Sequence, residues 1–205
     1  RFRDQAITME ELIQWGTVSK EAALFLEKLV CAGYNIFISG GTGSGKTTFM
    51  NALSNYIPKD ERIITVEDNA ELQLQGIKNL VRLEARNANA EGEMAVTIRD
   101  LIRSDRILIG EVRGSEAIDL LQALNTGHDG SISTGHANSP GDMLARLETM
   151  VLMGIEIPLS AVRRQIASAI DVIIHLGRLR DRTRKVLQII EILGYNGETG
   201  EVQTQ

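Results

Sequence analysis

Short, almost continuously apolar runs alternate with amphipathic segments along most of the chain. The apolar runs predict buried β-strands at residues 35–39, 62–68, 106–110, 131–134 and 171–176, and residues 79–86 alternate as a strand with one polar face would. Apolar positions at helical spacing predict helices at residues 20–33, 48–57, 97–103, 115–127, 139–154 and 160–169. This order predicts an α/β fold, a parallel sheet with helices on both faces.

The ends of several segments carry residues that favour helix caps and tight turns. Thr8 and Glu11 have capping-box spacing, which predicts a short helix after Thr8. Ser19 and Ser139 stand directly before helical segments, as N-cap residues do. Asn196-Gly197 in the tail predicts the turn of a C-terminal β-hairpin.

The length of 205 residues suits one domain, residues 1–205, because no repeat or long linker divides the chain. The chain begins with Arg1 rather than methionine, so we expect it to be the C-terminal part of a longer protein. A single cysteine, Cys31, cannot form an internal disulfide, and no apolar run reaches the length of a membrane span. We therefore expect a cytoplasmic location.

Charge and aromatic content bear on the partner. The net charge is −5 and aromatic residues make up 4% of the chain. Proteins that coat nucleic acid are usually basic, and those that bind single strands present aromatic platforms. No nucleic-acid partner is therefore expected.

A glycine-rich motif follows the first predicted strand. The sequence from Gly40 to Thr47, GGTGSGKT, satisfies the P-loop pattern G-x-x-x-x-G-K-[ST] between a strand and a helix. Glycines let backbone N–H groups surround phosphate oxygens, Lys46 places a charge on the β/γ-phosphates, and the Thr47 hydroxyl can ligate Mg²⁺. The motif predicts binding of ATP with Mg²⁺. The residues expected to contact the nucleotide are Gly41, Thr42, Gly43, Ser44, Gly45, Lys46, Thr47 and Thr48.

Acidic residues end two other buried strands, where a P-loop enzyme needs carboxylates for Mg²⁺ and water. Glu111 follows the apolar run 106–110 and is predicted to be catalytic and to help bind the metal. Glu67 ends the run that begins at residue 62, with Asp68 and Glu71 close behind. Each of these acids has an alternative role as a helix cap or turn residue.

His136 lies in a loop of small polar residues, SISTGHANSP, at the end of a predicted strand. If that strand neighbours the P-loop strand or the strand before Glu111, the imidazole lies at the phosphate edge of the sheet. It can then hydrogen-bond the γ-phosphate or the attacking water. His136 is therefore predicted to be a catalytic residue that senses the γ-phosphate.

Four motifs in fixed order resemble those of the type II/type IV secretion ATPases, in particular the CpaF-like branch that drives Flp/Tad pilus assembly. They lie in three stretches, ISGGTGSGKTTFMNALS, RIITVEDNAELQLQ and RILIGEVRGSEAIDLLQALNTGHDGSISTGHANSPGDMLARLE. The family's Walker A box matches residues 40–48, its Asp box 65–71, its Walker B box 107–113 and its histidine box 126–138.

The resemblance implies a RecA-like P-loop NTPase core with a C-terminal β-hairpin, working in a hexameric ring. It implies that an N-terminal domain is absent here and that the motor acts on an inner-membrane platform protein, from a cytoplasmic position peripheral to that membrane. Glu67 would activate or position water. Glu111 would carry the Walker B acid, next to Gly110 where many P-loop enzymes have aspartate. Arg1 and Arg3 would lie near the nucleotide, and His128 would be a second histidine of the box.

The chain departs from the family after residue 103. In the family the helix matching residues 97–103 continues through an alanine- and leucine-rich stretch before the Walker B strand, whereas here that strand follows almost at once. Such a connection is shorter than usual loop lengths. Two explanations stay open: residues are missing from the sequence near 103–104 and near 92–94, or the deletion is real and alters the helix packing below the nucleotide, which puts activity in doubt.

Other charged residues have two open interpretations each. Arg113 either reaches the γ-phosphate, as a nucleotide-binding residue, or pairs with an acid. Arg82 and Arg86 are either arginine fingers or part of a solvated strand face. His175 is expected to be structural, on a strand near the sheet edge. The basic run 178–185 is expected to form a solvated turn between two strands.

Three functions remain in competition at this point. The first is an ATP-hydrolysing motor for pilus assembly or secretion. The alternative with the same core is a RecA-like translocase stimulated by nucleic acid, against which the acidic charge and the histidine box count. The third is a nucleotide-binding scaffold without hydrolysis.

Overall fold

The computed structural model describes residues 6–67, 71–84 and 105–205. Its helices are α1 (Met9–Gln14), α2 (Lys20–Cys31), α3 (Lys46–Ser54), α4 (Ala117–Leu124), α5 (Pro140–Gly154) and α6 (Leu159–Ala169). Its strands are β1 (Ile36–Gly40), β2 (Arg62–Glu67), β3 (Asn79–Glu84), β4 (Arg106–Val112), β5 (Ile132–Gly135), β6 (Val172–Arg178), β7 (Arg184–Asn196) and β8 (Glu201–Thr204).

The strands form an 8-stranded sheet in the order β3-β2-β4-β5-β1-β6-β7-β8. Strands β1 to β6 pair in parallel, and β7 and β8 add two antiparallel strands at one side. The predicted α/β fold, with a mostly parallel sheet and a C-terminal hairpin, is therefore confirmed. The carboxyl ends of β1, β4, β5 and β6 meet at one edge of this sheet.

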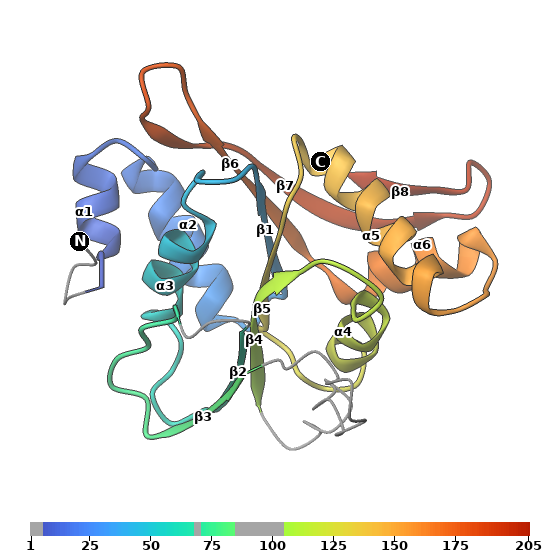
Figure 1. The fold of residues 1–205 in the computed structure, drawn as a ribbon, viewed down its shortest axis with the longest axis horizontal. Helices are drawn as coiled ribbons and strands as arrows, with labels where there is room; N and C mark the ends of the chain where they lie inside the picture. Colours follow the sequence, from blue (N-terminus) through green and yellow to red (C-terminus); the bar gives the residue numbers. More distant parts are fainter. Residues whose placement is uncertain (1–5, 68–70, 85–104) are drawn as a thin grey trace, which may run out of the picture.

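Helices cover both faces of the sheet (Figure 1). Helices α1, α2 and α3 pack on one face over side chains such as Ile36, Ile38 and Ile174. Helices α4, α5 and α6 pack on the other face over Phe37 and Ile173. Neighbouring residues of β1 thus enter different cores, as the side-chain alternation of a strand requires, and both cores exclude water from the strands that carry the site.

The predicted caps are confirmed. The Thr8 hydroxyl accepts the Glu11 N–H at 3.3 Å, while the Glu11 carboxylate accepts the Thr8 N–H at 3.0 Å, which completes a capping box. Ser19 caps α2, and Ser139 caps α5 by accepting the N–H of Asp142 at 3.0 Å. Asn196 lies at the β7–β8 turn, where its side-chain oxygen accepts the N–H of Glu198 at 2.8 Å.

Two strand predictions were inaccurate. β4 continues to Val112, past the predicted end at residue 110, because pairing with β5 resumes after a shift in register between Ile109 and Val112. β6 was expected near the sheet edge but lies between β1 and β7, because the antiparallel β7 covers its far side. The residues between β6 and β7 form the predicted exposed turn.

Several predictions lie outside the described residues. They are the helix at 97–103, the missing residues near 92–94 and 103–104, and the roles of Arg1, Arg3, Asp68 and Arg86. Among the described helices, none combines the length and the apolar character that a membrane span needs.

A buried arginine holds together the edge of the sheet opposite the carboxyl ends of the strands. Arg106, at the start of β4, is 3% exposed and forms an ion pair with Glu61, with Nη2 to Oε1 at 2.8 Å. Its Nη1 donates to the carbonyl oxygens of Val30 at 2.7 Å and Gly130 at 3.2 Å. One guanidinium group therefore links α2, the loop before β2 and the loop before β5.

Replacing Arg106 with alanine is expected to lower the free energy of unfolding by about 3–5 kcal/mol, because Glu61 and two carbonyl groups lose their buried partner. Denaturant unfolding followed by circular dichroism measures the change. Arg62→Ala is the matched control, since its side chain is exposed and should matter by less than about 0.5 kcal/mol. Equal effects of the two substitutions would contradict the anchoring role.

Candidate functional site

The predicted P-loop forms a tight turn between β1 and α3. Gly43 and Gly45 adopt left-handed backbone conformations with φ of 72° and 95°, which favour glycine. The Ser44 N–H donates to the Gly41 carbonyl at 3.2 Å, and α3 begins directly after Gly45. The N-terminus of α3, with its unpaired N–H groups, therefore faces the hollow of the loop, as an anion site requires.

Gly40 is the first glycine of the motif, whereas Gly41 occupies a position where the motif accepts any residue. A Cβ added to Gly40 would lie 2.4 Å from the Leu176 carbonyl oxygen and 2.6 Å from the Ser44 hydroxyl, whereas a Cβ on Gly41 would meet nothing within 4 Å. The backbone of β6 thus presses against the first P-loop residue. Only Gly40 needs to be glycine for reasons of space.

Lys46 turns its amino group back over the loop. Its side chain is largely buried, and Nζ donates to the carbonyl oxygens of Gly40 at 3.0 Å and Gly41 at 3.2 Å. Burial lowers the pKa of Lys46; the Glu111 carboxylate opposes this shift and Arg113 adds to it. The ammonium group therefore donates to two neutral carbonyl groups of the P-loop. An anionic ligand such as a phosphate would be a stronger hydrogen-bond acceptor for it than these carbonyl groups.

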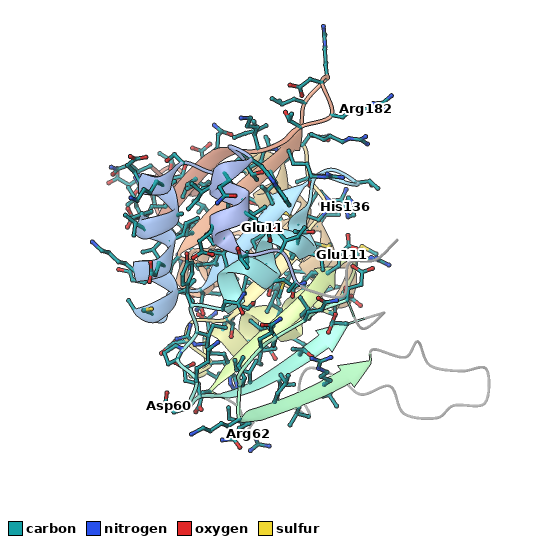
Figure 2. The ribbon with its side chains drawn as sticks, turned by 90° about the vertical axis from the view of Figure 1, so that its left-hand side faces the viewer. Glu11, Asp60, Arg62, Glu111, His136 and Arg182 are labelled. Atoms are coloured by element: carbon teal, nitrogen blue, oxygen red, sulfur yellow. The ribbon has the colours of Figure 1, made fainter. Side chains whose placement is uncertain are left out.

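Glu111, His136 and Arg113 form a cluster beside Lys46, from the ends of β4 and β5. Arg113 donates from Nε and Nη2 to Glu111 Oε2, at 2.9 and 2.5 Å, and His136 Nδ1 contacts Glu111 Oε1. Burial would raise the pKa of Glu111, but the hydrogen bonds from Arg113 and His136 outweigh it and hold this pKa below its ordinary value. Glu111 is thus an ionised, half-buried carboxylate, and Figure 2 shows it and His136 at the same edge.

The partners of His136 determine which ring nitrogen carries the proton. An ionised carboxylate only accepts, so Nδ1 must donate to Glu111. An ammonium group only donates, so Nε2, which lies 3.4 Å from Lys46 Nζ, must accept. The Thr42 hydroxyl lies 3.1 Å from the same Nε2. The imidazole therefore lies between the acid and the P-loop lysine, within hydrogen-bond distance of both.

Glu67 is buried but does not join this cluster. One of its carboxylate oxygens accepts the N–H groups of Glu71 at 2.8 Å and Leu72 at 2.7 Å. Its Cγ would lie 3.3 Å from a Cβ placed on Gly110, so glycine at that position leaves room for the Glu67 side chain. The structure therefore accounts for the absence of an acid at residue 110.

Other candidates lie apart from the cluster. His128 precedes β5 whereas His136 follows it, so this strand places the two histidines at opposite edges of the sheet. Arg82 is exposed on β3, an outer strand, with β2, β4 and β5 between it and the P-loop strand. Glu71 contributes backbone groups, to Glu67 and to Asn51. Within the described residues, no hydrogen bond or ion pair joins the side chains of Arg82 or Glu71 to the cluster.

Two arginines that sequence reasoning did not select lie over the P-loop. Arg184 Nε donates to the Gly43 carbonyl at 2.9 Å, and Arg178, its partner across the β6–β7 hairpin, lies close to Gly43 as well. The tip of this hairpin, near Arg182, extends beyond the body of the molecule (Figure 2). Both arginines belong to the basic run 178–185, which the sequence shows. That this run lies over the P-loop follows only from the pairing of β7 with β6.

An open pocket of about 600 Å³ lies on the other side of the P-loop, between Thr42, His136 and the outer face of α5. Asp142 and Arg146 line it with charges of opposite sign. The His136 side chain is therefore accessible to solvent through this pocket, on the side of the P-loop where Gly41 and Thr42 lie.

The site fits a nucleotide phosphate. The Ser44 hydroxyl is buried and has no hydrogen-bond partner among the described residues, so the cradle contains an unsatisfied polar group. Within residues 6–67, 71–84 and 105–205, no group of three His, Cys, Asp or Glu side chains is arranged to hold a metal ion. A Mg²⁺ ion here would therefore be bound mainly by phosphate oxygens and water, with the half-buried Thr47 at the start of α3 as the protein's hydroxyl ligand.

Comparison with known proteins gives consistent matches. The family described as Type II/IV secretion system protein matches residues 1–201. The chain is 43% identical over 180 residues to a putative conjugal transfer protein of Mycobacterium tuberculosis, covering 85% of this chain and 51% of that protein. It is 42% identical over 163 residues to the type IV secretion system protein PtlH of Bordetella pertussis, covering 75% of this chain and 48% of PtlH. The chain thus spans about half the length of these curated relatives.

A solved structure confirms the fold. The VirB11 ATPase from the Brucella suis type IV secretion system, solved in complex with sulphate, superposes with a TM-score of 0.75 and 31% sequence identity. The match covers 92% of this chain and 64% of that one. The P-loop, β-strands and C-terminal antiparallel pair described above therefore belong to an architecture seen in an experimental ATPase structure.

The contrast between the two adjacent glycines is testable. Gly40→Ala is expected to lower stability by about 1–3 kcal/mol, since the new methyl group clashes with the β6 backbone, and to weaken nucleotide binding. Gly41→Ala should leave stability nearly unchanged, because a methyl group there meets no other protein atom within 4 Å. Thermal unfolding and titration with a fluorescent ATP analogue measure the two properties. If the two variants behave alike, the close approach of β6 to Gly40 does not constrain the loop.

Proposed function

The chain belongs to the type II/IV secretion system protein family, and on that premise we propose that it is the ATP-hydrolysing part of a motor that powers secretion or pilus assembly. The observation that carries this proposal is the Glu111–His136–Lys46 cluster at the mouth of the P-loop. It sets the P-loop lysine beside an ionised carboxylate, and we propose that this carboxylate activates the attacking water.

In the proposed reaction, the P-loop N–H groups and the N-terminus of α3 bind the β-phosphate, and the unsatisfied Ser44 hydroxyl lies in the same cradle. Lys46 exchanges the carbonyl oxygens of Gly40 and Gly41 for oxygens of the β/γ-phosphates. This exchange replaces neutral acceptors with charged ones, so it strengthens each hydrogen bond. The remaining P-loop residues, Thr42, Gly43, Gly45 and Thr48, are proposed to contact the nucleotide through their backbone.

Glu111 is proposed to accept a proton from the water that attacks the γ-phosphorus, while the bond to the β-phosphate oxygen breaks. Its low pKa keeps it ionised and ready to accept, and Arg113 orients it through two hydrogen bonds. His136, as a neutral ring, donates to Glu111 and offers Nε2 to the lysine and Thr42. Loss of the γ-phosphate therefore changes the surroundings of the ring directly.

Glu67 is proposed to act at longer range, by positioning water or the segment after β2. Mg²⁺, held at Thr47 with the help of Glu111, would neutralise the charge that develops on the phosphate oxygens. Thr47 supplies a hydroxyl at the start of α3, and Glu111 approaches from β4.

The finer assignments are also proposals. We propose a hexameric ring, because the family resemblance implies one, with a cytoplasmic motor acting on a platform protein at the inner membrane. We also propose the CpaF-like branch, on the basis of the four sequence motifs. The named relatives are conjugal transfer and type IV secretion proteins, which supports the secretion class more directly than pilus assembly.

Glu111→Gln is expected to lower ATP turnover by about 10²–10⁴-fold while ATP binding survives, because the amide cannot accept the proton. Phosphate release and binding of a fluorescent ATP analogue measure the two properties separately. Glu148→Gln is the matched control, an acid on α5 that pairs with Arg163, and should retain full turnover. Unchanged turnover in Glu111→Gln would favour the scaffold function, and strong stimulation of the unsubstituted protein by DNA or RNA would favour the translocase.

The ring is tested by the mass of the particle in solution. With a non-hydrolysable ATP analogue, the full-length protein is expected to form a hexamer, measured by light scattering after size-exclusion chromatography. A Lys46→Ala variant should fail to respond to the analogue, because it lacks the phosphate-binding cation. A monomer at every analogue concentration would contradict the proposed ring.

A further inference from the structure

His175 is a buried histidine outside the cluster described above. It lies on β6, is 5% exposed, and is paired in register with Ser39 of β1, the residue before Gly40. Its Nδ1 lies 2.9 Å from the Ser39 hydroxyl, which is itself fully buried. The ring is therefore attached to the strand that carries the P-loop.

The backbone of Asn138 lies beside the same ring and, as a hydrogen-bonding group, acts to raise the pKa of His175. Asn138 lies two residues after His136, in the loop between β5 and α5. One side chain of β6 thus bridges the end of β1 and the loop after β5. The next residue of β6, Leu176, brings its carbonyl oxygen against Gly40, so β6 supports the P-loop at consecutive positions.

A neutral imidazole suits this bridge. It accepts a hydrogen bond at one nitrogen and donates at the other, so it satisfies the Ser39 hydroxyl and the Asn138 carbonyl together. Burial lowers the pKa of His175, which favours the neutral form, although the Asn138 bond and Asp142 on α5 act in the opposite direction. A buried polar group with both hydrogen bonds made restricts the geometry of the groups it joins.

We propose that His175 is a positioning residue for ATP hydrolysis, which holds the loop carrying His136 in register with the P-loop strand. This inference rests on the proposed catalytic role of His136. His175 makes no contact with Lys46, Glu111 or His136 among the described residues, so its effect passes through the Asn138 backbone. A purely structural His175 would affect stability alone, whereas a positioning residue would also affect kcat.

The test is a double-mutant cycle in the full-length protein, with kcat and KM measured for ATP hydrolysis. His136→Ala and His175→Ala are each expected to lower kcat about tenfold, the rate equivalent of one lost hydrogen bond. Because His175 acts through the His136 loop, the double variant should be no slower than His136→Ala alone. KM should change by less than about threefold in each variant.

Three other results would overturn the inference, and each has a different consequence for the proposed function. If His136→Ala is slow but His175→Ala keeps normal kcat, His175 has no positioning role and the proposed function stands. If the double variant loses the product of both effects, His175 acts independently of His136. If neither variant is slowed, the proposed role of His136 fails together with the inference.

Further variants separate positioning from stability and remain informative if His175→Ala does not fold. Ile173→Ala removes a buried side chain two residues earlier on the same face of β6, so it should lower the unfolding midpoint while kcat stays normal. His175→Asn retains an acceptor for Ser39 but is too short to reach Asn138, so kcat should fall. Ser39→Ala leaves the Asn138 bond in place and should be less affected. A normal kcat in His175→Asn would overturn the proposal.

Discussion

The site depends on one constraint: an ammonium group must be kept, largely buried, at the carboxyl edge of a parallel sheet. Burial favours loss of the Lys46 proton, as its lowered pKa shows, so the fold must supply acceptors at that point. The Gly40 and Gly41 carbonyl groups, His136 Nε2 and the nearby Glu111 charge together meet this need. Each of these groups comes from the end of a strand or from the loop that follows it. The order of the strands in the sheet therefore decides whether these groups meet around Lys46.

The need to hold that cation also determines the protonation of the groups around it. Because an ionised carboxylate only accepts hydrogen bonds, the ring of His136 donates from Nδ1 to Glu111 while its Nε2 faces Lys46. Arg113 then balances the charge of Glu111 from the solvent side, where it is 64% exposed. The acid is therefore held from two directions, by an exposed arginine and by a ring that also contacts Thr42 and Lys46 of the P-loop. A ligand that draws Lys46 Nζ away from the Gly40 and Gly41 carbonyl groups therefore also changes the surroundings of His136 and, through it, of Glu111.

Much of this arrangement is predictable from local sequence. The apolar runs predict the strands, Thr8, Ser19 and Ser139 predict their caps, and the GGTGSGKT motif predicts the cradle, because each signal depends on neighbours in the chain. Glu111 and His136 are also predictable as residues at strand ends. Their contact is not, since it requires β4 and β5 to be adjacent, which the pattern leaves open. For the same reason His128, from the same motif, is expected nearby but lies at the opposite edge.

The contacts that sequence patterns could not predict depend on β6 and β7, the strands on the far side of the P-loop strand. His175 has an ordinary strand pattern around it, and Arg184 belongs to a basic run that resembles a solvated turn. Only the parallel pairing of β6 with β1 brings His175 to Ser39, and only the antiparallel return of β7 brings Arg184 to Gly43. The β6–β7 hairpin therefore contacts the P-loop directly. Through Arg184 and Leu176, a displacement of β7 would reach the P-loop without passing through the hydrophobic cores.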